Sequence, residues 1–249
     1  YHDADVPGRH VAHNERWGFT PSVSFGLGTD TEWTLSYFRL EQDNIPDYGI
    51  PWVPNTNVPF AAYRDKPAPV DWSNFYGLKN RDFEDITTDV VTGEVTHQFN
   101  DDLSLRNLLR YGKTYRDSII TSPRFASTTS TDITRTDWKT RDQANTILSN
   151  QTDFTIKLET AELEHTIVPG IEFSHETDVN YGRVKTGTDS PATNLYTPNW
   201  DAAYLENIKR DGSEVNATSD TIAAYVFDTM KIDDHWSVNG GLRWDYFNL

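Results

Sequence analysis

A proline-rich stretch from Ile45 to Val70 combines a stiff backbone with side chains suited to binding. It holds six of the twelve prolines of the chain, interleaved with aromatic and basic residues. Proline fixes φ and lowers the entropy of a free loop, so such a segment holds a shape without ladder hydrogen bonds. Aromatic rings then offer stacking surfaces and cations attract negative charge, each contact contributing about 0.5–2 kcal/mol. The candidate binding residues in and just after this stretch are Tyr48, Trp52, Tyr63, Arg64, Lys66 and Trp72.

Two later segments repeat the same combination of residue types. "TSPRFAS" places Arg124 beside Phe125, and "NLYTPNW", ending at Trp200, adds further aromatic residues. We add Arg124 to the candidate binding residues. The alternative role for each aromatic is packing against a neighbouring loop or within a belt at a membrane interface.

Catalytic and metal-binding patterns are absent from the sequence. It contains no G-x-S-x-G, H-E-x-x-H or P-loop motif. The chain has no cysteine, which excludes thiolate zinc sites and cysteine nucleophiles. His175 with Asp178 is the one nearby Asp/His pair at a loop end, and a single pair does not make a catalytic set. We therefore expect no catalytic residues, no bound metal and no enzymatic activity.

Composition narrows the class of protein. The 249 residues carry a formal net charge of −16 and a pI of about 4.7, which argues against nucleic-acid binding because that needs a basic face. No stretch approaches the 18 apolar residues of a transmembrane helix. Mean hydropathy is −0.66, yet 13% of residues are aromatic. This mixture is typical of a membrane β-barrel, whose strands alternate lipid-facing and water-facing side chains.

Apolar residues recur with a period of two along much of the chain. Trp33, Leu35 and Tyr37 alternate with Glu32, Thr34 and Ser36, and Trp236, Val238, Leu242, Trp244 and Tyr246 do so near the end. This period predicts strands and not helices. Pro21 and Pro169 lie inside two of them and should interrupt the ladder. The predicted strands are 9–26, 31–44, 84–99, 102–117, 140–156, 162–177, 218–231 and 235–247.

The connections between these strands alternate in length. Four are short and turn-like, namely "LGTD", "FNDD", "LETAE" and "KIDD", whereas 45–83, 118–139 and 178–217 are long. Tight turns at one end and long loops at the other are expected for an outer-membrane barrel. A span needs only about 9–11 residues, so the longer strands should project beyond the bilayer on the loop side.

Three arginines follow the water-facing side of one predicted strand. Arg106, Arg110 and Arg116 could form a positive path for an anion, or they could pair with acids such as Glu94 and Glu172. The sequence favours ion pairs.

The order and the amino-acid sequences of these strands resemble those of one known family. "NERWGFTPSVSFGLGTDTEWTLSYFRLEQDNIPDYGIPWVP" is similar to the first part of the barrel of TonB-dependent ferric-siderophore receptors, especially the catecholate type. "VNGGLRWDYF", from Val238 to Phe247, is similar to a mid-barrel strand of the same family. The resemblance spans nearly the whole chain.

Fold and localisation follow from this resemblance. It implies an all-β, transmembrane antiparallel β-barrel in the bacterial outer membrane, with eight of about 22 strands present. Residues 1–249 are then one part of the barrel domain, without the plug domain and the C-terminal part of the barrel.

The resemblance also implies a function and partners. The protein would take up a ferric siderophore in a TonB-dependent manner, with iron carried inside the ligand and no cofactor bound directly. Its partners would be that siderophore, outer-membrane lipid and the TonB–ExbB–ExbD complex, reached through the plug. A ferric catecholate is an anion with planar rings, which suits the aromatic and basic residues of 45–83.

Three alternatives remain. The chain could be a passive porin. A porin, however, narrows its pore with a loop that folds inward, and does not need an outward-facing loop rich in prolines and aromatic residues. The chain could be a small eight-stranded barrel, although three long loops are disproportionate for one. A soluble carbohydrate-binding sandwich would not explain aromatic residues facing outward at both strand ends.

Overall fold

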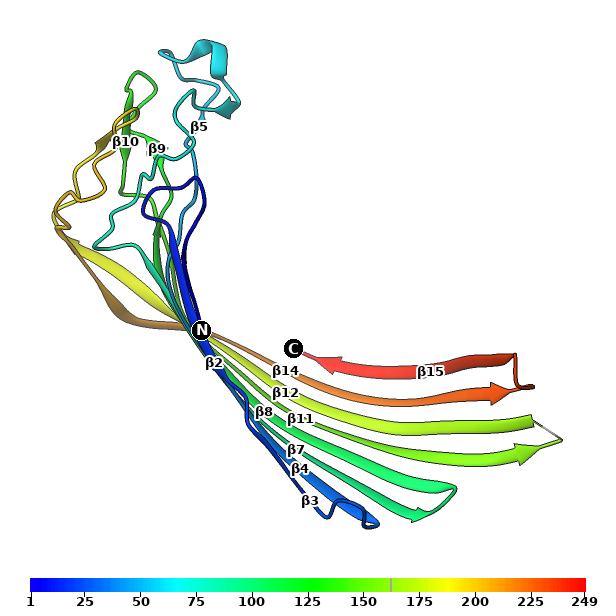
Figure 1. The fold of residues 1–249 in the computed structure, drawn as a ribbon. Coiled ribbons are helices and arrows are strands. Elements are labelled where there is room, and N and C mark those ends of the chain that lie inside the picture. The colour runs from blue at the N-terminus through cyan, green and yellow to red at the C-terminus, as the bar shows by residue number, and fades with distance from the viewer. Residues whose placement is uncertain (162) are drawn as a thin grey trace.

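The structure is a computed structural model that describes residues 1–161 and 163–249, and most of it is one curved antiparallel sheet (Figure 1). The strand order is β1-β2-β4-β7-β8-β11-β12-β14-β15, with β3 also paired to β4. The predicted all-β class and antiparallel order are confirmed. The strands are β1 (His2–Asp5), β2 (His13–Phe19), β3 (Ser22–Phe25), β4 (Thr31–Ile45), β7 (Phe83–Asn100), β8 (Leu103–Thr121), β11 (Trp138–Thr160), β12 (Leu163–Gly187), β14 (Glu206–Lys231) and β15 (Ser237–Asn248).

The two faces of the sheet differ in chemistry. Cross-strand register places the alternating apolar residues on one face, where they remain exposed. The opposite face carries polar side chains and ion pairs. An exposed apolar face of this extent is expected to meet lipid. Its residues include Trp33, Leu35, Leu109, Tyr111, Leu148, Ile171, Phe173, Ile222, Val226, Leu242, Trp244 and Tyr246.

The two strand prolines have different effects. The predicted strand 9–26 is wrong as one unit, because the ladder breaks at Thr20 and Pro21 into β2 and β3, and residues 6–12 form no strand. Pro169 lies inside an unbroken β12. Its pairing with β14 continues as Pro169↔Val226, whereas the register to β11 passes directly from Asp153↔Gly170 to Ile156↔Ile167. The missing N–H is therefore accommodated on the β11 side.

Several strands run well beyond the predicted bounds at the loop end. β12 continues to Gly187 and β14 begins at Glu206, so the predicted loop 178–217 is wrong and only 188–205 connects them. The loop predicted at 118–139 shortens to 122–137 in the same way. The loop predicted at 45–83 is confirmed within a residue as 46–82. We call these three connections the first (46–82), second (122–137) and third (188–205) long loops.

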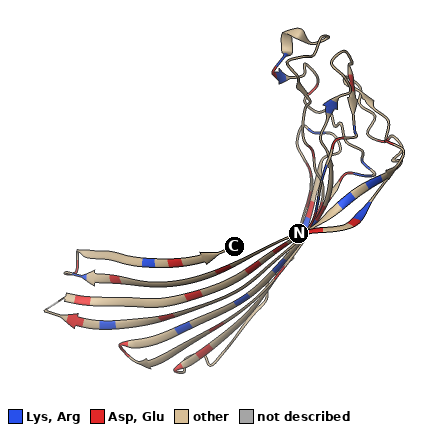
Figure 2. Cartoon of the chain, turned by 180° about the vertical axis from the view of Figure 1, so that it is seen from behind, with Lys and Arg blue, Asp and Glu red and all other residues tan. Residues whose placement is uncertain are grey.

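The long loops and the short turns lie at opposite ends of the sheet (Figure 1). Acidic residues recur at the turn end (Figure 2), among them Asp101, Asp102, Asp233 and Asp234. The predicted turn "LETAE" includes Glu162, which lies outside the described residues.

The main cluster of buried hydrophobic residues lies in the long loops. Its buried residues come from all three long loops and are Val53, Phe60, Ala68, Tyr76, Ile133 and Leu195. Small elements frame it: β5 (Trp52–Val53), η1 (Ala61–Tyr63), β6 (Lys66–Pro67), β9 (Arg124–Phe125), β10 (Asp132–Thr134) and β13 (Thr193–Asn194). The loops therefore form a packed cap on one end of the sheet.

The sheet is open within the part of the chain that is described. β1 and β15 lie at the two ends of the strand order and do not pair with each other. The described strands therefore do not close into a small barrel of their own. Across 1–161 and 163–249, no helix is long and apolar enough to cross a membrane.

Candidate functional site

The tip of the first long loop is a small hairpin that presents four of the seven candidate residues. β5 pairs with β6, with Trp52 opposite Pro67 and Val53 opposite Lys66, and η1 carries Tyr63 in the connection. Val53 is fully buried beneath the hairpin, whereas the Trp52 and Tyr63 side chains are exposed. The hairpin thus buries Val53 and Phe60 and turns the rings of Trp52 and Tyr63 to the outside.

The cations of the hairpin remain accessible. Arg64 donates its Nε to the carbonyl oxygen of Asn57 at 2.8 Å, which fixes the stem of the side chain. Lys66 is exposed. The cation–ring contacts among the described residues lie elsewhere, at Arg39, Arg210 and Arg243. Arg64 and Lys66 therefore share the hairpin with the aromatic rings without being stacked on them.

Tyr48 and Trp72 lie apart from the hairpin, in segments that are tied to the N-terminal part of the chain by Arg9. The guanidinium of Arg9 is paired with Asp47 and donates to the Trp72 carbonyl oxygen and, at 2.8 Å, to that of Asn74. Both aromatic side chains are exposed. Sequence reasoning missed Arg9, because it assigned residue 9 to the start of a strand.

Arg124 lies in β9 of the second long loop and has an acidic partner. Its Nε is 3.0 Å from Asp137, which also accepts from Lys139 at 2.9 Å. These hydrogen bonds, of which the one from Lys139 has the larger effect, hold the pKa of Asp137 below its ordinary value. Arg124 is only partly neutralised because more than half of its side chain remains exposed.

Aromatic contacts join the loops that carry these residues. The ring of Phe60 in the first loop lies 5.7 Å from Phe125 in the second and 6.4 Å from Tyr196 in the third. Trp200 stacks on His10 at 5.5 Å. The third-loop aromatics of "NLYTPNW" thus contribute to packing, although Tyr196 also keeps an exposed surface.

The arginines on the polar face mostly form ion pairs, as the sequence favoured. Arg106 lies 2.7 Å from Glu94 and 3.4 Å from Asp153, and Arg116 is paired with Glu84. Glu172 lies 2.9 Å from Arg243. The pairs of Arg106 and Arg116 bridge neighbouring strands, whereas that of Glu172 and Arg243 joins β12 to β15 across β14.

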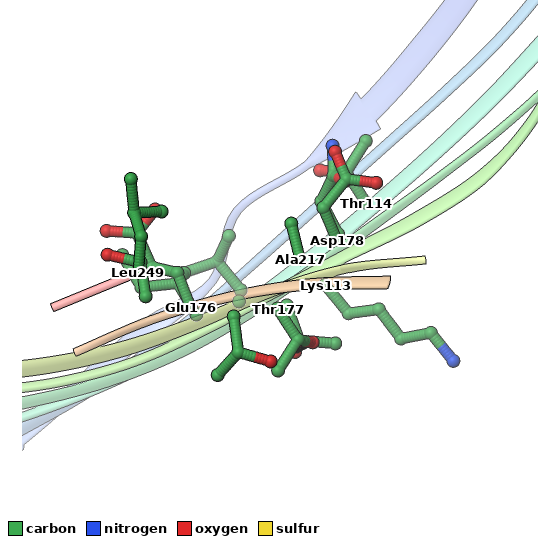
Figure 3. Close-up of a pocket in the computed structure, with 14 residues that line it drawn as sticks. Lys113, Thr114, Glu176, Thr177, Asp178, Ala217 and Leu249 are labelled. Atoms are coloured by element: carbon green, nitrogen blue, oxygen red, sulfur yellow. Dashed lines mark hydrogen bonds between the residues drawn. The ribbon is translucent and has the colours of Figure 1, made fainter. Parts of the chain in front are cut away.

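A shallow hollow of about 420 Å³ lies where the sheet carries a glycine. Gly112 leaves room between Val90 and Ile147, whose methyl carbons would lie 3.5 and 3.0 Å from an added Cβ. Figure 3 shows Thr114 and Asp178 on one side of the sheet and Lys113 on the other. Within the described ranges, no group of three or more His, Cys, Asp or Glu residues is arranged to hold a metal ion.

The chain is similar to several known proteins over almost its whole length. Residues 17–249 match the family model described as TonB dependent receptor-like, beta-barrel. The chain is 36% identical over 259 residues to the catecholate siderophore receptor Fiu of Escherichia coli O157:H7, covering 99% of this chain and 33% of that protein. It is 28% identical over 262 residues to the probable TonB-dependent siderophore receptor PiuA of Acinetobacter baumannii, covering 95% and 34% respectively.

Solved structures show the same fold. A crystal structure of the ferric-catecholate import receptor Fiu from E. coli K12, in a closed form, aligns with a TM-score of 0.83 at 34% identity. The alignment covers 98% of this chain and 36% of that one. The chain therefore spans about a third of the length of the curated relatives it matches.

Proposed function

Because this chain belongs to the TonB-dependent receptor family, we propose that it is part of a receptor that takes up a ferric siderophore, of the catecholate type, across the bacterial outer membrane. Iron enters as part of the ligand and not as a bound cofactor. The family is one of receptors and transporters, which disfavours a passive porin, and we propose no enzymatic activity. The open sheet described above is then one arc of a barrel of about 22 strands.

The observation that carries this proposal is the exposed hairpin of the first long loop. Trp52 and Tyr63 present flat rings, and Arg64 and Lys66 present charge, on a tip anchored by the buried Val53. Rings and cations match the planar, anionic rings of a ferric catecholate. Pre-formed loops lose less conformational entropy on binding, which favours affinity. We propose Tyr48, Trp72 and Arg124 as further contacts.

The partners proposed for the complete protein extend beyond these residues. The apolar face contacts outer-membrane lipid. Energy for uptake comes from the TonB–ExbB–ExbD complex acting through a plug domain, which lies outside 1–249. We propose no nucleic-acid partner for a chain of net charge −16.

The proposal is tested by quenching of intrinsic tryptophan fluorescence in the full-length receptor. Iron-loaded and iron-free catecholate ligands are titrated into the wild type and into a Trp52→Ala, Tyr63→Ala, Arg64→Ala triple variant. Loss of three contacts of about 0.5–2 kcal/mol each should weaken binding tenfold or more, since about 1.4 kcal/mol is a factor of ten. Trp236→Ala, at the turn end of β15, is the matched control for losing one fluorophore.

Two results contradict the proposal in different ways. Absence of saturable, iron-dependent quenching in the wild type contradicts the assignment of a ferric catecholate as the ligand. Unchanged affinity in the triple variant leaves the receptor but removes the hairpin from its binding site.

A further inference from the structure

Arg135 of the second long loop connects the other two long loops through its guanidinium. The residue is fully buried, at 0% exposure. Its Nε donates to the carbonyl oxygen of Tyr76 in the first loop at 3.0 Å. Its two Nη atoms donate to the carbonyl oxygens of Pro191, at 3.4 Å, and Asn199 in the third loop. One side chain therefore contacts three backbone carbonyls on two separate segments.

The backbone of the same residue is held from the first loop by a second buried arginine. Arg81 donates its Nη1 to the Arg135 carbonyl oxygen at 3.1 Å. Arg81 is itself fixed by ion pairs to Asp82 at 2.9 Å and to Glu206 at 3.3 Å. The charge of Arg81 is thus balanced locally, and Arg135 is clamped at both its backbone and its side chain.

Other contacts close the connection between the first and third loops around this point. The Tyr76 hydroxyl donates to the Leu195 carbonyl oxygen at 2.7 Å, and the Lys79 N–H donates to that of Trp200 at 3.0 Å. Tyr76 and Leu195 also belong to the buried apolar cluster of the loops. The three loops consequently share one core instead of packing separately on the sheet.

Arginine is chemically suited to this position. Its planar fork offers five N–H donors and can serve carbonyls that lie in different directions. Burial lowers the pKa of Arg135 to about 10, with the Arg81 charge as a second cause, so the group stays protonated at neutral pH. An apolar residue here would leave the buried Tyr76 carbonyl and the part-buried Pro191 and Asn199 carbonyls without this donor.

We propose that Arg135 is a positioning residue for the ligand surface, which holds the three long loops as a single body. The hairpin with Trp52 and Tyr63 then keeps a fixed arrangement relative to Arg124, which lies on the same loop as Arg135. The ligand part of this inference rests on the proposed function. The coupling between the loops does not.

The coupling is tested by hydrogen–deuterium exchange in the full-length receptor. Arg135→Met keeps the length and apolar stem of the side chain but removes all donors. Backbone exchange should then rise by about tenfold or more in residues 72–80 and 190–200, while the strands β8 and β11 keep their protection. Arg135→Lys retains the charge but has fewer directed donors, so its exchange rates should lie between those of Arg135→Met and the wild type. It replaces Arg135→Met in the test if that variant does not assemble.

Lys209→Ala is the matched control. It removes an exposed cation next to the third loop that has no hydrogen bond or ion pair with any residue in 1–161 or 163–249. Its exchange pattern should equal that of the wild type. Unchanged protection of either neighbouring loop in Arg135→Met overturns the coupling, whether or not the receptor binds a catecholate.

The positioning role is tested by a thermodynamic cycle on ligand affinity. Arg135→Met should weaken ferric-catecholate binding by about tenfold in the wild-type background. The same change should have little further effect in the background that lacks the Trp52, Tyr63 and Arg64 side chains, because the groups that it positions are gone. Equal loss in both backgrounds overturns the positioning role, as does unchanged affinity when both loops have lost their protection.

Discussion

Replacing Leu109 with arginine tests which face of the sheet meets lipid. Leu109 lies in β8, is 49% exposed and pairs with Gly93 and Asn150 on the apolar face. Leu108, the preceding residue, lies directly opposite Glu94 on the polar face. Leu109→Arg and its matched control Leu108→Arg therefore introduce the same charge at neighbouring positions of one strand, on opposite faces.

The expected cost follows from the position of Leu109 along β8. From Leu103, where the strand begins, it lies about 20 Å along the chain at about 3.3 Å per residue. With a strand tilt of about 40°, this corresponds to about 15 Å in height, near the middle of an apolar band about 25 Å tall. Arginine at that depth costs about 2–4 kcal/mol. Leu108→Arg should cost less than about 1 kcal/mol, because it faces Glu94 in a polar lumen.

The assay is guanidinium unfolding of the full-length receptor in lipid vesicles, followed by tryptophan fluorescence. Both variants are compared with the wild type by the change in unfolding free energy. A difference of about 2 kcal/mol between them is expected, with Leu109→Arg the less stable. Equal costs, or a larger cost for Leu108→Arg, would refute the assignment of the two faces.

Three further predictions concern packing and charge. Gly170→Ala should lower stability by about 1–3 kcal/mol in the same titration, because the new Cβ would lie 2.3 Å from the Tyr225 ring; an unchanged midpoint contradicts this. Tyr76→Phe should speed hydrogen exchange in the third long loop, since a buried carbonyl there loses a hydrogen bond with a cost of about 1–3 kcal/mol; unchanged exchange would count against the contact. Hydrogen bonds, of which the one from Lys139 has the largest effect, lower the pKa of Asp137 in the folded protein. The contribution of Asp137 to the stability of the loop is therefore complete above the ordinary aspartate pKa near 4 and is lost as the pH falls through the lower folded pKa. A spin label at Ser127 should therefore stay ordered from neutral pH to about 5 and loosen only below about 4, and loosening near pH 6 would be inconsistent with this assignment.

The strands were predictable from sequence wherever lipid lies on one side and water on the other. There the side chains alternate, and the period of two is visible. The alternation ends after Thr177 in β12 and begins only at Thr218 in β14, although β12 continues to Gly187 and β14 already begins at Glu206. At the loop end water lies on both faces, so no alternation is needed. Hydrogen bonding to neighbouring strands, interrupted by a bulge between Tyr181 and Arg183, extends the ladder there without a pattern in the sequence.

The candidate site was predictable only in part. The hairpin was recognisable because prolines and aromatics crowd one segment. Arg135 gave no such signal, because its partners Tyr76 and Asn199 lie 59 and 64 residues away along the chain. A buried cation that binds only backbone carbonyls depends on how three loops meet, and a single sequence does not encode that meeting as a motif.

The shared core of the long loops has a consequence for how specificity changes in evolution or in engineering. Residues 46–82 make contacts whose partners lie in 122–137 and 188–205. Examples are Phe60 with Phe125 and Tyr76 with Leu195. A chimera that receives one of these segments from a related receptor inherits mismatched partners. Ligand preference should therefore be inherited as a set of three segments, and recombination between relatives should preserve the set or lose the fold of the cap.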